Sequence, residues 1–153
     1  MLQLGLVTAG LVILLDQLSK LAILALLDDA VVVTPFLNLV VVWNRGVSFG
    51  MLDSAGALMP WLLSVLALAV VAALGVWLRR VEHPLAGVAL GLIIGGALGN
   101  VIDRVRFGAV VDFLDVHALG YHWPAFNVAD SAICVGAALL LADGLLAPRR
   151  QRT

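Results

Sequence analysis

Four stretches of the chain are long, strongly apolar and nearly free of charged residues. A bilayer core about 30 Å thick requires about 20 mostly apolar residues in a helix. Each stretch meets that length, so we predict four membrane-spanning helices. They run roughly over residues 4–27, 57–78, 85–105 and 127–146.

The composition agrees with this pattern. Of the 153 residues 63% are hydrophobic and 12% are charged, and the mean hydropathy is +1.10. A soluble domain is about half apolar and about a quarter charged. We therefore predict one membrane-embedded domain over residues 1–153. Its 9 basic residues are scattered and form no polyanion-binding face, so we expect no nucleic-acid partner.

The first stretch is predicted to stay in the mature protein. It lacks the basic start of a secretory signal peptide, and it carries Asp16 and Lys20 where a cleavage region would lie. In the second stretch Trp61 and Trp77 are about 24 Å apart along a helix, a spacing that suits the two aromatic belts of a bilayer.

The basic residues set the predicted orientation. They are concentrated in the link after the second stretch and in the C-terminal tail, and such segments usually face the cytoplasm. Both termini are then cytoplasmic, and two loops, 28–56 and 106–126, lie outside. The residues that carry this argument are Arg79, Arg80, Arg149, Arg150 and Arg152, whereas Arg45, Arg104 and Arg106 run against the rule.

The outer loops have the pattern of short strands. "VVVTPFLNLVVVW" and "VVDFLDVH" are rich in β-branched residues. The predicted fold is therefore an all-α polytopic membrane protein of four transmembrane helices, with a small extracytoplasmic β-containing platform over 31–49. The loop after Phe113, with Gly120, Tyr121 and Trp123, is expected to be a lid that limits water at the site.

Glycines recur every four residues along the third stretch, as Gly87, Gly91, Gly95 and Gly99. Such a stripe is typical of close helix packing. A neighbouring stripe with the same spacing is Gly96, Asn100 and Arg104, so polar groups turn toward something at the outer end of this helix.

Further charged residues lie within the stretches. Asp16 and Lys20 are four residues apart and share a helix face, so they either form an ion pair or take part in a site. Asp103 is expected to pair with Arg104 or Arg106 and to hold the end of the third helix.

Paired carboxyls are the candidate catalytic device. No HExxH motif is present, and Cys134 lies in an apolar run where we expect it to be buried. Among the outer polar residues, Asp112 and Asp130 can meet at the membrane surface. Two adjacent carboxyls share a proton, so one can deprotonate water while the other protonates a scissile carbonyl. The spacing of Asp112, Asp115, His117, His122 and Asp130 matches no standard metal-ligand set.

Five motifs in this order resemble the lipoprotein signal peptidase (signal peptidase II) family of bacterial membrane aspartic peptidases. The resemblance covers almost the whole chain. The motifs are "DQLSK" at 16–20, "NRGVSFG" at 44–50, "GGALGNVIDR" at 95–104, "VVDF" at 110–113 and "FNVADS" at 126–131.

The resemblance implies that Asp112 and Asp130 are the catalytic dyad and that no metal or cofactor is used. It implies cleavage of a diacylglyceryl-modified prolipoprotein just before the lipid-modified cysteine, at the outer face of the bacterial inner membrane. We further expect contact with membrane lipid, a monomer, and inhibition by globomycin-type peptides. The residues expected to bind substrate or support the site are Asn44, Gly96, Asn100, Arg104, Asn127, Asp16 and Lys20.

Two other classes of protein remain open on the residues themselves. Asp16, Lys20, Asp130 and Asp143 can be arranged as the relay of a proton-coupled transporter, although the polar residues gather at the outer end and no inverted repeat is visible. If there is no such relay, we expect Asp143 to be structural, because Arg149 or Arg150 can neutralise its charge. A non-catalytic scaffold would use the glycine stripe as an oligomer interface. Substituting Gly91 by Leu would then disrupt the oligomer, whereas in a peptidase it would mainly lower the stability of the fold.

Overall fold

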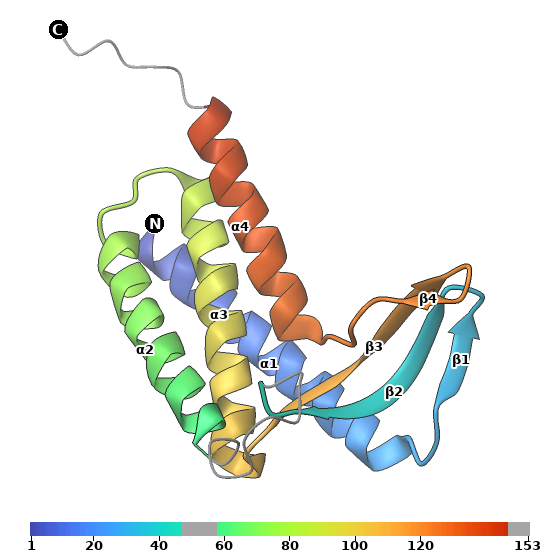
Figure 1. Ribbon diagram of the computed structural model, residues 1–153. Coiled ribbons are helices and arrows are strands. Elements are labelled where there is room, and N and C mark those ends of the chain that lie inside the picture. Colours follow the sequence, from blue (N-terminus) through green and yellow to red (C-terminus); the bar gives the residue numbers. More distant parts are fainter. Residues whose placement is uncertain (47–57, 147–153) are drawn as a thin grey trace, which may run out of the picture.

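The four apolar stretches form four helices, and the two outer loops contribute the strands of one small sheet (Figure 1). The computed structural model describes residues 1–46 and 58–146. In chain order the elements are α1 (Leu2–Leu26), β1 (Val31–Thr34), β2 (Leu37–Asn44), α2 (Met59–Leu78), α3 (Pro84–Phe107), β3 (Val110–Ala118), β4 (Tyr121–His122) and α4 (Val128–Leu146).

All four helices are long and apolar enough to cross a membrane, so the predicted spans are confirmed. Their observed ends lie within about two residues of the predicted ones. Three predicted features fall outside the described residues: position 57 at the start of the second span, positions 47–49 of the platform, and the basic tail after Leu146.

Helix α3 is the centre of the bundle. It packs against α1, α2 and α4, and in Figure 1 it lies between α2 and α4 while α1 crosses behind. In α3, 61% of the membrane-crossing window is buried, against 22% or less in the other three helices. The outer helices therefore cover α3 and expose their own aliphatic side chains, such as Val65 and Leu66 on α2, to the lipid.

The glycine stripe lets α1 approach α3 closely, as predicted. A Cβ added at Gly91 would lie 2.5 Å from the carbonyl oxygen of Gly5, and one at Gly95 would lie 2.7 Å from that of Ala9. On the neighbouring face, a Cβ at Gly96 would collide with the carbonyl oxygen of Ala129 in α4. Because only hydrogen fits at these positions, the backbones of three helices meet directly.

The sheet is antiparallel in the order β1-β2-β3-β4, which confirms the predicted strands. It extends from the end of the bundle opposite to the α2–α3 link, and its long strands curve away from the helices (Figure 1). Strand β3 carries Asp112, which lies opposite Val42 of β2. A two-residue turn joins β3 to β4, and its central residues Leu119 and Gly120 both have positive φ, at 52° and 81°.

The connection from α3 to β3 is short because Gly108 ends the helix. This residue adopts the left-handed conformation, at φ 69°, and its N–H donates to the carbonyl of Arg104 at 2.9 Å. Strand β3 starts two residues later, at Val110. The end of α3 and the first residues of β3 are therefore held side by side.

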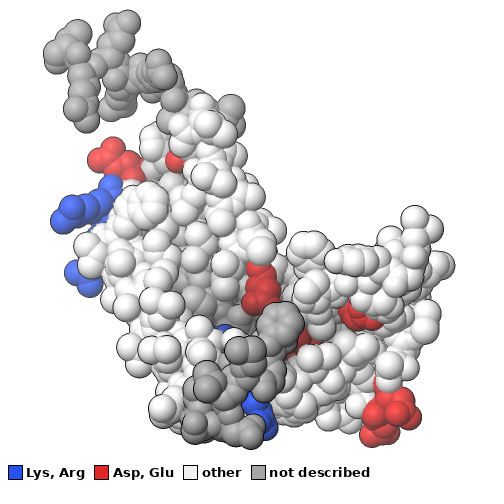
Figure 2. Space-filling model, in the orientation of Figure 1, with Lys and Arg blue, Asp and Glu red and all other residues white. Residues whose placement is uncertain are grey.

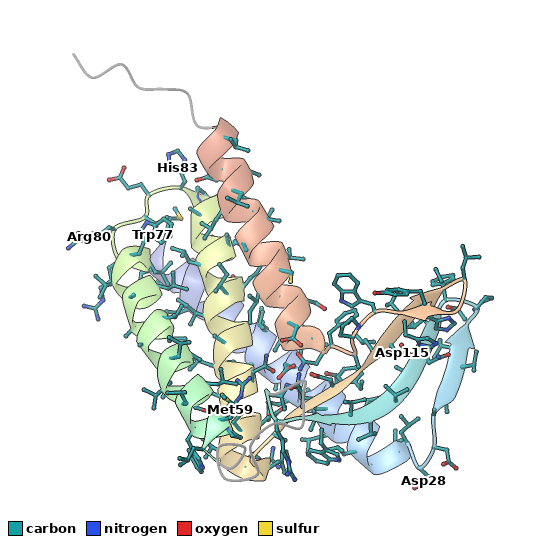
Figure 3. All side chains as sticks on the ribbon, in the orientation of Figure 1. Asp28, Met59, Trp77, Arg80, His83 and Asp115 are labelled. Atoms are coloured by element: carbon teal, nitrogen blue, oxygen red, sulfur yellow. The ribbon has the colours of Figure 1, made fainter. Side chains whose placement is uncertain are left out.

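The α2–α3 link carries exposed charges at the end of the bundle away from the sheet. Figure 3 labels Arg80 and His83 there, close to Trp77, and Figure 2 shows basic and acidic side chains gathered on that edge. Trp61 is exposed near the other end of α2, so the two Trp residues lie where interfacial belts are expected.

A side chain at Gly91 should destabilise the bundle. In Gly91→Ala the new methyl group would overlap the Gly5 backbone and Thr8, and overpacking of this kind costs about 1–3 kcal/mol. The matched control is Gly10→Ala on α1, where an added Cβ meets nothing within 4 Å. We expect thermal unfolding in detergent to show a lowered midpoint for Gly91→Ala and an unchanged or higher one for Gly10→Ala. Equal midpoints for the two variants would contradict the packing assigned to the stripe.

Candidate active site

Polar side chains from five elements meet where the sheet joins the bundle. Figure 2 shows a hollow between the helices and the sheet, with acidic side chains on its walls. The side chains that meet here are Asp16 and Lys20 of α1, Asn44 of β2, Asn100 and Asp103 of α3, Asp112 of β3 and Asp130 of α4, together with Asn127 just before α4.

Asp112 is held on β3 by two amide donors. Its side chain is almost fully buried, at 1% exposure. Oδ2 accepts a hydrogen bond from Asn44 Nδ2 at 2.9 Å, and Oδ1 accepts one from Asn127 Nδ2 at 2.7 Å. The amide of Asn44 is oriented in turn by Gly46, whose N–H donates to Asn44 Oδ1 at 2.8 Å. Both oxygens of Asp112 therefore have a neutral partner.

Asp130 occupies the third position of α4, where it forms a reciprocal cap with Asn127. The Asp130 N–H donates to Asn127 Oδ1 at 2.9 Å, and Asp130 Oδ2 accepts from the Asn127 N–H at 3.3 Å. Its other oxygen accepts from Asn100 Nδ2 at 2.8 Å. The cap fixes the side chain, and the helix N-terminus favours negative charge at this position.

Asn127 connects the two carboxyls. Its Oδ1 faces the backbone of Asp130 while its Nδ2 donates to Asp112, so one buried amide contacts both residues. Nδ2 also lies 3.2 Å from Asn100 Oδ1 and 3.3 Å from the carbonyl of Val111. The structure therefore brings together the two aspartates that the sequence placed 18 residues apart.

Burial raises the pKa of Asp112 to about 6, and the negative charge of Asp130 adds to this effect. The hydrogen bonds from Asn44 and Asn127 and the charge of Lys20 act in the opposite direction, but they do not outweigh burial. Up to about pH 6 Asp112 therefore holds a proton while Asp130 lies close by. Such a pair can act as an acid and a base at once.

Asp16 and Lys20 form the predicted ion pair, and they also support the site. Lys20 Nζ lies 2.8 Å from Asp16 Oδ2, and both side chains are buried. Lys20 also donates to Asn100 Oδ1 at 3.1 Å, while Asp16 Oδ1 accepts from the Ala129 N–H at 2.9 Å. The structure therefore shows the ion pair and places it in contact with Asn100 and the first turn of α4.

The prediction for Asp103 was wrong. Within the described residues Asp103 forms no ion pair with Arg104 or Arg106; it pairs with Lys20 Nζ at 2.8 Å. A buried ammonium group requires counter-charges, and Asp103 faces inward where Lys20 lies, whereas Arg106 points outward. Arg106 instead lies over the Phe107 ring, 4.8 Å from its centroid, and donates to Gln17 at 3.4 Å.

The two remaining members of the predicted set lie at the edge of the site. Gly96 touches α4 rather than a carboxyl, so it acts by letting the start of α4 approach α3. Arg104 is partly buried, and its Nε has no hydrogen-bond partner within the part of the chain that the structure describes. Its guanidinium lies within electrostatic reach of Asp130 and Asp112.

Gln17 is a site residue that the sequence analysis missed. Its Nε2 donates to Asp103 Oδ1 at 2.9 Å and lies 3.3 Å from the carbonyl of Gly99. It follows Asp16 in the "DQLSK" motif, and that position was the available signal.

Cys134 is exposed, which overturns the expectation that it is buried. It lies on the outward face of α4, one turn after Asp130, and apolar runs in a membrane protein can face lipid as well as a core. A cavity of about 570 Å³ opens there beside the site. Its walls are formed by Trp123, Pro124, Ala125, Phe126, Asp130, Ser131, Cys134 and Val135.

Asp115, His117 and His122 form a separate cluster farther along the sheet. His122 Nδ1 lies 2.8 Å from Asp115 Oδ1, Asn38 donates to Asp115 at 2.9 Å, and the two histidine rings stack with centroids 4.8 Å apart. The hydrogen bond from His122, followed by that from Asn38, lowers the pKa of Asp115. Over residues 1–46 and 58–146, no three His, Cys, Asp or Glu side chains are grouped so as to hold a metal ion.

Comparisons with known proteins agree on one family. The family model described as "Signal peptidase (SPase) II" matches residues 8–146. The chain is 49% identical over 144 residues to a lipoprotein signal peptidase of Methylobacterium sp. (strain 4-46), covering 92% of this chain and 87% of the relative. It is 52% identical over 142 residues to that of Ralstonia nicotianae, covering 90% and 82%.

Solved structures show the same fold. A bacterial membrane enzyme determined by the in meso method at 1.9 Å resolution superimposes with a TM-score of 0.80 at 33% identity, covering 94% of this chain and 93% of that one. A second bacterial membrane enzyme, determined in the same way at 2.3 Å, gives a TM-score of 0.78 at 31% identity, covering 97% and 93%.

The raised pKa of Asp112 predicts a pH dependence of stability. Between the usual carboxyl value, 3.8, and about 6, the folded chain keeps a proton that the unfolded chain releases. The stabilisation is complete below that window and is lost as the pH rises through it, with a slope of up to about 1.4 kcal/mol per pH unit. We expect thermal unfolding from pH 3.5 to 7.5 to show this loss for the wild type but not for Asp112→Asn.

Asp115→Asn is the matched control for this measurement. The pKa of Asp115 is lowered, so the folded and unfolded chains differ in the protonation of this carboxyl mainly below pH 4. Asp115→Asn should therefore keep the wild-type slope between pH 4 and 6. A wild-type slope equal to that of Asp112→Asn would mean that Asp112 does not take up the proton.

Proposed function

This chain belongs to the signal peptidase II family, and on that basis we propose that it is a membrane aspartic endopeptidase whose dyad is Asp112 and Asp130. A peptidase of this family removes the signal peptide from prolipoproteins. The observation that carries the proposal is the pair of carboxyls joined through Asn127, one of which has a pKa raised by burial to about 6. Membership in a peptidase family also sets aside the transporter and the scaffold.

In the proposed reaction Asp130 acts first as the base and Asp112 as the acid. Asp130 takes a proton from a water molecule, whose oxygen attacks the scissile carbonyl carbon. Asp112 donates its proton to the carbonyl oxygen, which gives a neutral tetrahedral diol. Transfer of a proton from Asp130 to the amide nitrogen then lets the C–N bond break, and Asp112 recovers its proton from the diol.

The surrounding amides suit this cycle. Asn44 and Asn127 donate to Asp112, and Asn100 donates to Asp130, so each carboxyl is oriented without a bound cation. A cation at hydrogen-bond distance would hold a carboxyl in its ionised form and remove the acid from the pair. Arg104 lies near enough to act on charge that develops during the reaction.

The proposed substrate is a prolipoprotein whose cysteine already carries diacylglycerol, cut just before that cysteine. Two acyl chains would hold the cysteine at membrane depth, so that much of the cost of positioning is met before binding. The cavity beside Asp130 has apolar walls, including Trp123, Phe126 and Val135, and lies where a lipid-embedded chain can reach the dyad.

We propose that the dyad faces the outside of the bacterial inner membrane. The sheet lies at the end of the bundle opposite to the α2–α3 link (Figure 1), and that link contains Arg79 and Arg80. Basic links favour the cytoplasmic side, so the sheet end would be extracytoplasmic.

Cleavage of a diacylglyceryl-modified prolipoprotein by the purified chain, in detergent with EDTA, tests the proposed reaction. We expect the wild type to cleave, and Asp112→Asn and Asp130→Asn each to lose at least roughly 10³-fold in rate, because each loses an acid or a base. Asp143→Asn, on the same helix as Asp130 but near its other end, is the matched control and should retain the rate. Activity that survives in either dyad variant would reject the assignment, as would a wild type that cannot cleave.

The proposed lid is the β3–β4 hairpin. Residues 113–118 belong to a strand, so the part that can close is the turn at Leu119 and Gly120 with Tyr121 and Trp123. We expect hydrogen exchange at 119–123 to slow when a substrate analogue is bound, because closure would shield these amides. Exchange that is equally fast with and without the analogue would show that the hairpin is not a lid.

A further inference from the structure

Asp103 lies directly behind the site, yet the proposed reaction gives it no role. It belongs to the last turns of α3 and is almost fully buried, at 1% exposure. Its Oδ2 lies 2.8 Å from Lys20 Nζ and accepts the N–H of Val111 at 3.1 Å, while its Oδ1 accepts from Gln17 at 2.9 Å. One carboxylate therefore contacts α1 and the first residues of β3 from α3.

The contact with Val111 acts on the catalytic strand. Val111 directly precedes Asp112, and its backbone N–H is bound by the Asp103 carboxylate. Backbone donors bound by an ionised carboxylate form stronger hydrogen bonds than donors bound by a neutral carbonyl. The start of β3 is thus tied to α3, and a shift of Asp103 would move the backbone that carries Asp112.

The contact with Lys20 acts on the other half of the dyad through Asn100. Lys20 Nζ and Asn127 Nδ2 both donate to Asn100 Oδ1, at 3.1 and 3.2 Å. A reversed amide would place its NH₂ group against these two donors, so the carbonyl must face them and Nδ2 must face Asp130. Lys20 is held in place for this purpose by the carboxylates of Asp16 and Asp103.

We infer that Asp103 is a positioning residue for the dyad: with Lys20 it fixes the start of β3 beneath Asp112 and the amide of Asn100 against Asp130. The inference rests on the proposed function. Asp103 touches neither carboxyl of the dyad in the hydrogen-bond network, so it acts through Val111 and Lys20.

Asp103 also sets the charge that the dyad experiences. Among the described residues, the charged groups near Asp112 are Asp130 on α4, Lys20 on α1 and Arg104 on α3. Lys20 is itself paired with Asp16 and Asp103. The positive charge of Lys20 lowers the pKa of Asp112. Removing the negative charge of Asp103 leaves that positive charge less compensated, so the pKa of Asp112 should fall from its raised value.

Two single variants and the double variant distinguish the effect of Asp103 on the position of β3 from its effect on the pKa of Asp112. In Asp103→Asn we expect kcat to fall roughly 10²-fold, because the start of β3 loses its anchor, with KM changed little. The basic limb of the pH–rate profile should move to lower pH. In Lys20→Met that limb should move to higher pH, since the opposing charge is gone. In the double variant the limb should return close to its wild-type position while kcat stays low.

The Asp112 titration is followed independently of cleavage. Carbon NMR of ¹³C-labelled aspartate carboxyls in detergent, with the Asp112 signal identified by its loss in Asp112→Asn, should give the same order: Asp103→Asn lowest, Lys20→Met highest. Thermal unfolding of each variant is used to check that it is folded. Asp115→Asn, another shielded carboxyl of the sheet region, is the control and should keep the wild-type profile.

The outcomes separate this inference from the proposed reaction. A wild type that does not cleave rejects the proposed function. If the wild type cleaves and Asp103→Asn has the same kcat and the same Asp112 titration, the positioning role is rejected but the proposed function is not. A folded Asp103→Asn that loses kcat without any displacement of the Asp112 titration also rejects it, because a purely structural defect would give that result.

Discussion

Burial of the Lys20 ammonium group is the constraint on which the rest of this site depends. A charge taken out of water costs several kcal/mol unless it is paired and hydrogen-bonded, and a bilayer offers no water in compensation. This cost is offset because Lys20 Nζ pairs with Asp16 and Asp103, both at 2.8 Å, and donates to the side-chain carbonyl of Asn100. Because these partners come from two helices, α1 and α3 must lie at one relative height, and the register of the bundle follows from it.

The glycines on α3 make this arrangement possible. A Cβ at Gly99 would lie 2.6 Å from Asp16 Oδ2, so hydrogen at this position leaves room for the carboxylate that holds Lys20. Asp16 in turn accepts the N–H of Ala129, which ties the first turn of α4 to α1. Since Asp130 is the next residue, close helix packing and the position of the dyad are parts of one arrangement.

The sequence allowed the helices, the strands and the candidate dyad to be predicted, but not how the charges pair. Apolar length alone identifies the spans, because the lipid imposes it, and β-branched residues identify the strands. Asp103 could not be assigned correctly, since its partner Lys20 lies 83 residues earlier and nearby arginines offered a local alternative. Cys134 was misplaced for a related reason: hydropathy does not distinguish a side chain that faces lipid from one that faces another helix.

Charge is divided unevenly between the two halves of the site, as the proposed reaction requires. Lys20, Asp16 and Asp103 are paired with one another, whereas the dyad receives hydrogen bonds from side-chain amides. Each amide is oriented by a donor behind it: Gly46 N–H for Asn44, Lys20 for Asn100, and Asp130 N–H for Asn127. The positive charge of Lys20 therefore acts on the proposed dyad from one layer away, through Asn100. Within the described residues it forms no hydrogen bond to either carboxyl, so it does not fix the proton that the proposed dyad would share.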